Sequence, residues 1–263
     1  MFQCLETLAP FIADVINQSL AIGTVPDCYK HAIVKPMLKK RGLDENALKN
    51  FRPISNLKFL SKILEKLVLK QLLEHLNKSK LNEVFQSAYK AFHSTETALL
   101  KVTSDVLESM DQKEICVMTL LDLSAAFNTI DRNILLTRLN QTFGLSGTVL
   151  QWFESYLSNR TQSVFNGDHT SRKLPLVFGV PQGSVLGPIL FTLYTSPLSS
   201  IIKLHGMSYH LYADDTQMYC TDTINNLPLL LSKTSICIES VKEWMMTNKL
   251  KLNDDKTEIS WHI

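Results

Sequence analysis

Zinc-binding and disulfide patterns are missing from this chain of 263 residues. Its five cysteines, at positions 4, 28, 116, 220 and 237, include no Cys-x-x-Cys spacing, and the seven histidines form no zinc-ligand grouping with them. The number of cysteines is odd, and three of them fall in apolar strand-like or helix-like patterns. This usage favours buried, reduced thiols in an intracellular protein of the nucleus or the cytoplasm.

Segments that would indicate secretion or membrane insertion are missing as well. Residues 185–202 carry no charge, but two prolines and six Ser, Thr or Gly residues make this stretch a poor membrane span. We expect a buried helix there and no membrane partner. Residues 2–20 place apolar side chains at helical spacing without a basic start, so residues 1–26 are predicted to form an N-terminal amphipathic helix rather than a signal peptide.

Two adjacent acidic residues, Asp214 and Asp215, lie between the apolar segments 207–212 and 216–220. These segments are rich in Tyr, Leu and Met, and the short polar break between them predicts a β-hairpin with the acidic pair at its turn. Adjacent carboxylates repel each other, and desolvation adds to that cost, so a divalent metal is the expected partner. For this pair taken alone, a solvated Asp-Asp turn is the alternative.

A third carboxylate, Asp122, lies near the end of the apolar run 115–123. A run so short and so rich in branched residues predicts a strand that is covered on both faces. Asp131 is predicted to cap the helix that follows. Three carboxylates on two core strands are what a two-metal phosphoryl-transfer site requires, because Mg²⁺ prefers oxygen ligands and shares them with substrate phosphates. A metal pair ~4 Å apart can activate an attacking hydroxyl and stabilise the leaving oxygen.

A loop rich in glycine and proline, residues 178–188, comes between Asp122 and the two adjacent aspartates. Small residues let the backbone approach a ligand closely. Gln182, in the sequence Pro-Gln-Gly, offers donors and an acceptor to a nucleotide or a template strand. Pro-Gln-Gly alone is a weak signal, but its place between the two acidic motifs makes it a strong one.

In this order, the motifs resemble those of reverse transcriptases. The segments LDLSAAF (121–127), GVPQGSVLGP (179–188) and YADD (212–215) look like three successive palm motifs of that family. More narrowly, the chain resembles the non-LTR (LINE-type) retrotransposon branch. Further matches are NFRPIS (50–55), FQS (85–87), HSTETAL (93–99) and LNDDKT (252–257). The similarity runs from about residue 27 to the C-terminus, roughly nine-tenths of the chain.

The resemblance implies an RNA-directed DNA polymerase. Such an enzyme adds deoxynucleotides, supplied as dNTPs, to the 3′-hydroxyl of a DNA primer on an RNA template. The catalytic residues would be Asp122, Asp214 and Asp215, which would hold two Mg²⁺ ions, with Mn²⁺ as a substitute.

Five further residues would bind the nucleotide if the resemblance holds. Lys35 and Arg52 would neutralise the triphosphate, and Gln182 would contact the nucleotide or the template. Phe127 would lie beneath the incoming sugar and exclude a 2′-hydroxyl; the alternative for this residue is an ordinary core phenylalanine. Lys256 would lie near the pyrophosphate leaving group and protonate it.

The net charge of +2 conceals a strong asymmetry. Residues 30–90 hold 14 Lys and Arg against 5 Asp and Glu, a net of +9, and the remainder has a net of −7. A basic part that grips phosphate backbones, joined to an acidic part that binds metal, suits a polymerase. Lysines 58, 62, 66 and 70 recur every four residues and can equally form the wet face of a helix. The better candidates for phosphate contacts are Lys35, Lys39, Lys40, Arg41 and Arg52.

The expected fold class is α+β, a polymerase fingers–palm fold in which an antiparallel palm sheet is backed by helices on one face. The reverse transcriptase domain would span residues 27–263, with fingers at about 27–114 and palm at about 115–263. Residues 160–178 could return to the fingers. The chain stops seven residues after Lys256 and no endonuclease region precedes residue 1, so we expect a truncated copy in which the thumb is absent.

Two positions depart from the family pattern. Residue 128 is Asn where similar sequences usually carry Asp, and residue 132 is Arg where they usually carry His. Asn128 keeps the hydrogen-bonding shape but loses the charge, so we expect impairment rather than loss of activity. One alternative is therefore a catalytically impaired retrotransposon remnant that acts only as a nucleic-acid-binding or interaction domain. Another is a palm-fold nucleotide cyclase or a different two-metal enzyme, which the Pro-Gln-Gly loop, Phe127 and the basic first third argue against.

Overall fold

The computed structural model describes residues 3–123, 126–253 and 256–262. The chain forms two compact units. The first unit combines Met1–Leu81 with Asp131–Gly187, and the second combines Asn82–Ile130 with Pro188–Ile263. Neither unit begins or ends at residue 115, where the palm was expected to begin. A division into compact units does not by itself identify fingers or palm, so the residue ranges expected for the N-terminal helix, the fingers and the palm stay predictions.

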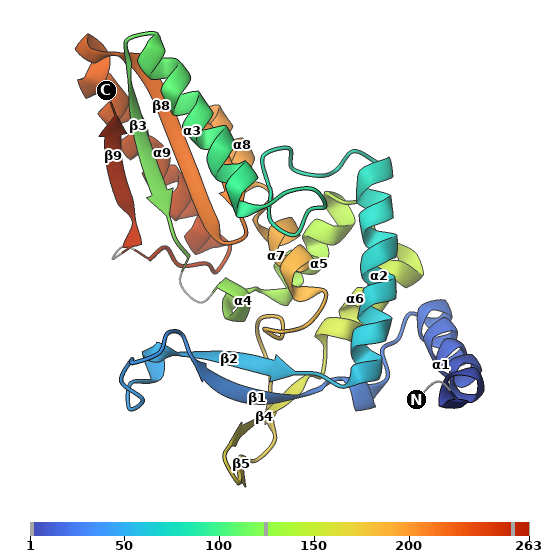
Figure 1. Ribbon diagram of the computed structural model, residues 1–263. Coiled ribbons are helices and arrows are strands. Elements are labelled where there is room, and N and C mark those ends of the chain that lie inside the picture. The colour runs from blue at the N-terminus through green and yellow to red at the C-terminus, as the bar shows by residue number, and fades with distance from the viewer. Residues whose placement is uncertain (1–2, 124–125, 254–255, 263) are drawn as a thin grey trace. The chain divides into compact units, whose positions relative to one another are not determined.

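A four-stranded antiparallel sheet is the centre of the second unit (Figure 1). Its strand order is β7-β8-β3-β9. The bounds are β3 (Glu114–Leu121), β7 (Ser208–Tyr212), β8 (Asp215–Thr223) and β9 (Glu258–His262). The described helices of this unit are α3 (Thr95–Asp111), α4 (Ala126–Thr129), α7 (Gly187–Thr195, from Pro188 on), α8 (Leu198–Leu204) and α9 (Leu227–Thr247), with a 3-10 turn η3 (Ile224–Asn226).

Helices cover both faces of this sheet. Directly paired residues share a face, and Met118 pairs with Tyr219. On that face Cys116 and Tyr219 pack against α3, and on the other face Met218 contacts Cys237 of α9. The strand expected to be covered on both faces is therefore confirmed, although it ends at Leu121. The expectation of helices on one face only is wrong, because a central strand with no polar alternation needs cover on both sides.

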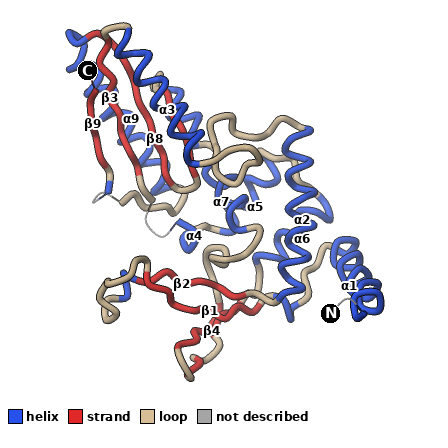
Figure 2. The backbone as a smooth tube through the Cα atoms, viewed as in Figure 1, coloured by secondary structure: helices blue, strands red, loops and turns tan. Residues whose placement is uncertain are grey.

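The first unit contains a second, mixed sheet, drawn in red in Figure 2. Strand β1 pairs antiparallel with β2 and parallel with β4. The bounds are β1 (His31–Leu38), β2 (Phe51–Asn56), β4 (Thr161–Asn166), β5 (His169–Thr170) and β6 (Leu174–Pro175). A hairpin turn lies between β4 and β5, where Asn166 pairs with His169 and Gly167 has a φ of 61°. Strand β2 was not predicted; it contains Pro53, which an edge strand tolerates.

The first unit also contains helices. They are α1 (Gln3–Ile22), α2 (Phe59–Lys78), α5 (Arg132–Gln141) and α6 (Gly147–Leu157), with 3-10 turns η1 (Asp27–Tyr29) and η2 (Leu48–Asn50). In α2, Leu64, Val68, Leu72 and Leu76 are buried at intervals of four, while lysines 58, 66 and 70 are exposed. Asp131 caps α5 as predicted, accepting hydrogen bonds from the N–H groups of Asn133 and Ile134.

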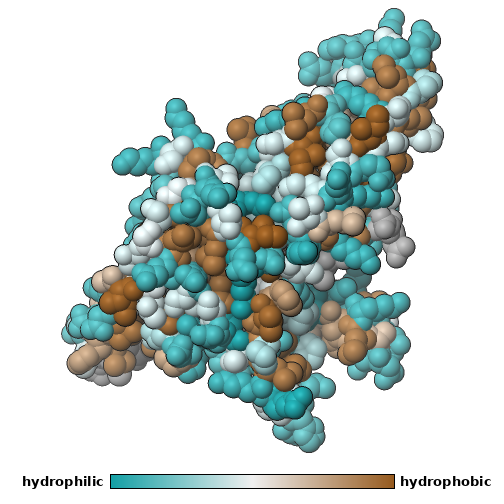
Figure 3. All heavy atoms as spheres, turned by 180° about the vertical axis from the view of Figure 1, so that it is seen from behind, coloured by the Kyte–Doolittle hydropathy of each residue, from teal (hydrophilic) through white to brown (hydrophobic). Residues whose placement is uncertain are grey.

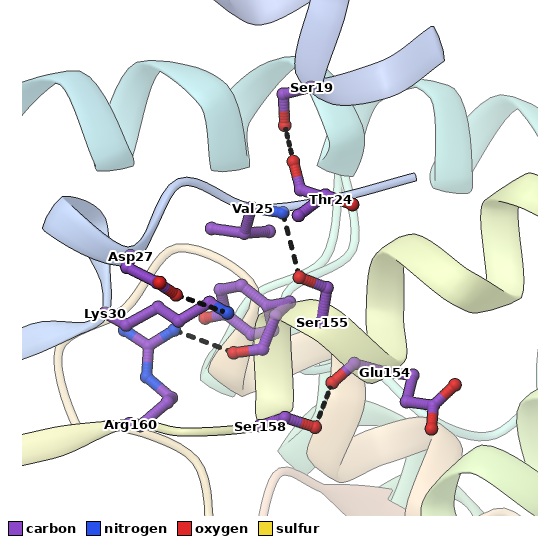
Figure 4. A network of polar contacts seen from close by, with 10 residues as sticks. Ser19, Thr24, Val25, Asp27, Lys30, Glu154, Ser155, Ser158 and Arg160 are labelled. Carbon is purple, nitrogen blue, oxygen red and sulfur yellow. Dashed lines mark hydrogen bonds and ion pairs between the residues drawn. The ribbon is translucent and has the colours of Figure 1, made fainter. Parts of the chain in front are cut away.

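Helix α1 is attached to α6. The indole N–H of Trp152 donates to Ser19 at 3.1 Å. Just after the helix, the N–H of Val25 donates to the Ser155 hydroxyl at 2.9 Å, as Figure 4 shows. Ile16 is buried. Leu8, Phe11 and Val15 are exposed, however, and the hydrophobic patch over α1 is seen at the lower left of Figure 3. A helix therefore forms at Gln3–Ile22, and only part of its apolar surface is covered within the unit.

Residues 185–202 do not form the single buried helix that their lack of charge predicts. They contain α7 (Gly187–Thr195) and the start of α8, with Pro197 at the N-cap of α8. Proline lacks the N–H that a continuous helix needs and its ring clashes with the preceding turn, so the chain breaks there. The interior position is as expected, because Leu190, Phe191 and Tyr194 are fully buried. Within the described ranges, no helix is long and apolar enough to cross a membrane.

Candidate active site

The two adjacent aspartates lie at a tight hairpin turn, as predicted. Tyr212 pairs with Asp215, which leaves Ala213 and Asp214 as a two-residue turn between β7 and β8. Ala213 has a φ of 56°, a conformation that favours glycine in such turns. Its N–H donates to Oε1 of Gln86 at 3.2 Å, and this contact helps to hold the turn in shape.

Strand register places Asp122 beside Asp215. The ladder between β3 and β8 ends with the pair Leu121 and Thr216, so the next residues on the two strands are Asp122 and Asp215. Desolvation raises the pKa of the Asp215 carboxyl, and repulsion from Asp214 and Asp122 raises it further. Asp215 is exposed overall, so water screens part of both effects. The three acids thus act on one another electrostatically at one end of the sheet.

Asp122 already has two partners. Its Oδ2 atom accepts hydrogen bonds from the side-chain amide of Asn253 and from Nζ of Lys256, each at 3.0 Å. The backbone N–H of Asn253 also donates to the Asp122 carbonyl at 2.9 Å. The segment that contains Lys256 is therefore bound to the end of β3. Asp254 and Asp255, which belong to the LNDDKT match, lie outside the described residues.

The donor set fits a divalent ion that is shared with a substrate. Carboxylate oxygens are the ligands that Mg²⁺ prefers, and the repulsion at Asp215 is what a bound cation would relieve. Across the part of the chain that the structure describes, no three or more Asp, Glu, His or Cys side chains form a group that could hold a metal. A ready-made protein cage is therefore not present there, whereas Mg²⁺ commonly takes one or two carboxylates, waters and substrate phosphates.

Phe127 is held by an aromatic contact in the second unit. It lies on the short helix α4 and is half-buried. Its ring centroid is 5.1 Å from that of the buried Phe191, with the planes tilted by 32°. The ring thus packs against Phe191, and the residue stays partly accessible. The neighbouring Asn128 is exposed.

Lys35 and Arg52 lie on one exposed face of the sheet in the first unit. Lys35 pairs with Ile54 and Met37 pairs with Arg52, so the two cations are diagonal neighbours across the β1–β2 pair. Both side chains belong to exposed residues. This arrangement gives the sheet two adjacent positive charges that can meet a polyanion.

Gln182 lies at the free edge of the same sheet. The N–H of Ser55, on β2, donates to the Gln182 carbonyl at 2.7 Å. Gly183 follows with a φ of 113°, and a Cβ there would lie 2.7 Å from the carbonyl oxygen of Ser55. Only glycine allows the loop to approach β2 this closely. The structure therefore places Lys35, Arg52 and Gln182 on the sheet of the first unit. In the second unit it brings the three aspartates and Lys256 to one end of the sheet, and Phe127 contacts Phe191.

Sequence reasoning missed several residues that hold these groups. Gln86 and Asn253 support the aspartates, and both lie inside segments that resemble family motifs, so a signal was present. Glu65 contacts the Gln182 loop, and its only sequence signal is a charge on the apolar side of a helix. Arg132, which departs from the family pattern, donates through its guanidinium to the Leu176 carbonyl and so joins α5 to the segment that leads toward the loop.

Comparison with known proteins gives concordant results. A family model described as reverse transcriptase (RNA-dependent DNA polymerase) matches residues 38–262. The RNA-directed DNA polymerase from mobile element jockey of Drosophila melanogaster is 29% identical, over 94% of this chain and 27% of the relative. The probable RNA-directed DNA polymerase from transposon X-element of the same fly is 30% identical, over 78% of this chain and 22% of the relative. The chain thus spans about a quarter of the length of these relatives.

Among solved structures, apo telomerase from Candida tropicalis truncated from its C-terminal domain has a TM-score of 0.64. The sequence identity is 17%, and the match covers 95% of this chain and 54% of that one. This likeness confirms the expected fingers–palm fold. The matches to mobile-element polymerases confirm the resemblance to the non-LTR retrotransposon branch that the motifs indicate.

Proposed function

Because the chain belongs to the reverse transcriptase (RNA-dependent DNA polymerase) family, we propose that it forms the nucleotide-adding part of an RNA-directed DNA polymerase. Its partners would be an RNA template, a DNA primer and dNTPs. The observation that carries the proposal is the strand register that brings Asp122 beside Asp215, next to the turn that holds Asp214. Charge of one sign concentrated at the end of a buried sheet is costly unless it serves a cationic ligand.

The three aspartates would bind two Mg²⁺ ions, with Mn²⁺ as a substitute. Divalent ions supply charge neutralisation at the phosphates and activation of the attacking hydroxyl when they are bound. Asp214 sits in a turn held by Gln86, and Asp122 is oriented by Asn253. Ligands held in this way need little rearrangement on binding, which favours the in-line geometry of phosphoryl transfer.

The remaining residues would act on the nucleotide and the nucleic acid. Lys35 and Arg52 would neutralise the triphosphate from the exposed face of the β1–β2 pair. Gln182 would contact the nucleotide or the template. Phe127, packed against Phe191, would exclude a 2′-hydroxyl. Lys256 would donate a proton to the leaving pyrophosphate as a general acid.

Primer extension on an RNA template tests the proposal. We expect the purified chain to add dNTPs to an annealed DNA primer when Mg²⁺ is present, and to add none in excess chelator. Binding of the same template–primer, measured by fluorescence anisotropy, is followed in parallel. The assay is repeated with Mn²⁺. Firm binding of the template–primer without extension in Mg²⁺ or in Mn²⁺ would contradict the proposal and favour the alternative of a nucleic-acid-binding remnant.

A further inference from the structure

Glu65 is a buried carboxylate to which the proposed reaction gives no role. It lies on α2 with 1% of its surface exposed. Its Oε1 atom accepts a hydrogen bond from the Ser61 hydroxyl at 3.2 Å. Its Oε2 atom accepts three more, from the Tyr156 hydroxyl at 3.2 Å and from the backbone N–H groups of Val185 and Leu186 at 2.7 and 3.1 Å.

A buried carboxylate in this position needs hydrogen bonds that compensate the cost of burying it. Burying an ionised carboxylate is costly unless it is well hydrogen-bonded, and none of the ion pairs among the described residues includes Glu65. Its strongest compensation comes from the two backbone N–H groups, because a hydrogen bond to a charged acceptor is roughly twice as strong as a neutral one. The carboxylate therefore binds α2 to the second half of the Gln182 loop.

The first half of the same loop is bound elsewhere. Ser55 donates its N–H to the Gln182 carbonyl at 2.7 Å, and the N–H of Ser184 donates to the carbonyl of Pro181 at 3.0 Å. The loop thus has one anchor on β2 at Gln182 and a second on Glu65 at residues 185 and 186. With the second anchor lost, the Gln182 carbonyl would keep its bond to Ser55, but the loop could rotate about that single bond. The direction of the Gln182 side chain would then no longer be set.

We propose that Glu65 is a positioning residue for nucleotide addition: its carboxylate clamps the backbone of Val185 and Leu186 and thereby fixes Gln182 for contact with the nucleotide or the template. This inference rests on the proposed function and adds a requirement to it. Glu65 touches no substrate in this account. It acts only through the loop.

Three substitutions separate the clamp from other roles of the side chain. Glu65→Leu removes both acceptors at similar volume. Glu65→Asp keeps the charge but withdraws the oxygens, and it serves if the leucine variant does not fold. Glu65→Gln keeps one oxygen that can accept from both N–H groups. The control Ser61→Ala removes a partner of Glu65 that does not belong to the loop.

Kinetics on a template–primer give the first measurement. We expect Glu65→Leu and Glu65→Asp to lower kcat/KM for the incoming dNTP by about 10- to 100-fold, as a small misplacement of a binding group does. Glu65→Gln and Ser61→Ala should stay within about tenfold of the parent chain. Equal losses in all four variants would indicate a general effect of folding and would overturn the proposal.

Hydrogen–deuterium exchange of the full chain, without nucleic acid, gives a second measurement that needs no activity. The amides of Val185 and Leu186 should exchange at least about tenfold faster in Glu65→Leu and Glu65→Asp than in Ser61→Ala, as loss of their acceptor predicts. Unchanged exchange would overturn the clamp. Faster exchange with unchanged kcat/KM would overturn the positioning role. Protected amides in a parent chain that extends no primer would overturn the proposed function and the role of Glu65 in it, but not the clamp itself.

Discussion

Lys256 and Asp122 form an ion pair in which Nζ and Oδ2 are 3.0 Å apart. The lysine expected at the leaving group is thus bound to an aspartate expected to hold metal. The Lys256 side chain is 67% exposed and that of Asp122 is 20% exposed, so the pair is partly screened by water. A divalent cation at Asp122 would compete with the ammonium group for the same oxygen.

Removal of this ammonium group should have opposite effects on metal binding and on catalysis. In Lys256→Met we expect tighter binding of Mn²⁺, by about fivefold at most, because exposed ion pairs contribute roughly 0–1 kcal/mol. The rate of nucleotide addition should fall, because the general acid is lost. Mn²⁺ titration by electron paramagnetic resonance and single-turnover kinetics measure the two effects. Lys251→Met is the control, and metal affinity no higher than in that control would contradict the competition.

The face that carries Lys35 and Arg52 should respond to salt. If each cation contacts a phosphate, Lys35→Gln and Arg52→Gln should each reduce the slope of log affinity against log salt by about one, as counterion release requires. Anisotropy with an RNA–DNA duplex, repeated over a range of salt concentrations, measures the slope. Lys66→Gln, on the exposed face of α2, should leave it unchanged. If all three variants have the slope of the parent chain, the β1–β2 face is not part of the binding surface.

Phe127 should select the sugar of the incoming nucleotide. Phe127→Ala is expected to raise the ratio of ribonucleotide to deoxynucleotide incorporation roughly tenfold or more, because a cavity then accepts the 2′-hydroxyl. Competition assays with both nucleotide types give the ratio. The control Phe191→Leu removes the neighbouring ring and keeps the ring of Phe127. An unchanged ratio in active Phe127→Ala would assign this residue to the core alone.

His210 is a buried histidine that should make stability depend on pH. Its Nε2 atom lies 2.9 Å from the Ser87 hydroxyl, and its Nδ1 atom has no hydrogen-bond partner among the residues that the structure describes. Burial lowers the pKa of His210, and the nearby charges that act on it are Lys101, His93, Asp105 and Lys90. All of these except Asp105 lower the pKa further. The neutral ring is therefore the form that the fold accommodates.

The sign of the effect follows from this shift. Because the folded-state pKa of His210 lies below its unfolded value of about 6.5, the unfolded chain takes up the proton first. The free energy of unfolding should therefore fall as the pH decreases through about 6.5 and level off below the folded-state pKa. Urea unfolding at about pH 5 and about pH 7.5 measures the fall. His210→Gln should weaken this dependence and His205→Gln should not; parallel curves for the two variants would contradict the assignment.

Local patterns predicted much of the fold, whereas contacts between distant segments were beyond them. Lysines 62, 66 and 70 lie on a helix, α2, as their spacing of four allows, since that spacing is contained in the helix itself. The hairpin at Asp214 could likewise be predicted from the two apolar segments that flank it. Glu65 and Val185, however, are 120 residues apart, and Gln86 and Ala213 are 127 apart. Hydrophobic periodicity describes neighbours along one element, so it could not predict contacts between residues this far apart in the sequence.

The central claim is that the aspartates at the end of β3 and at the β7–β8 turn carry out nucleotide addition. Single-turnover primer extension on an RNA template, comparing the parent chain with Asp214→Asn and Asp222→Asn, tests it most directly. Asp222 is the matched control, an aspartate near the other end of β8 that accepts hydrogen bonds from Thr223 and Asn226. We predict extension by the parent chain and by Asp222→Asn, and a loss of at least about 100-fold in Asp214→Asn, the scale expected for a group that stabilises the transition state. Extension by Asp214→Asn at the rate of Asp222→Asn would contradict the account.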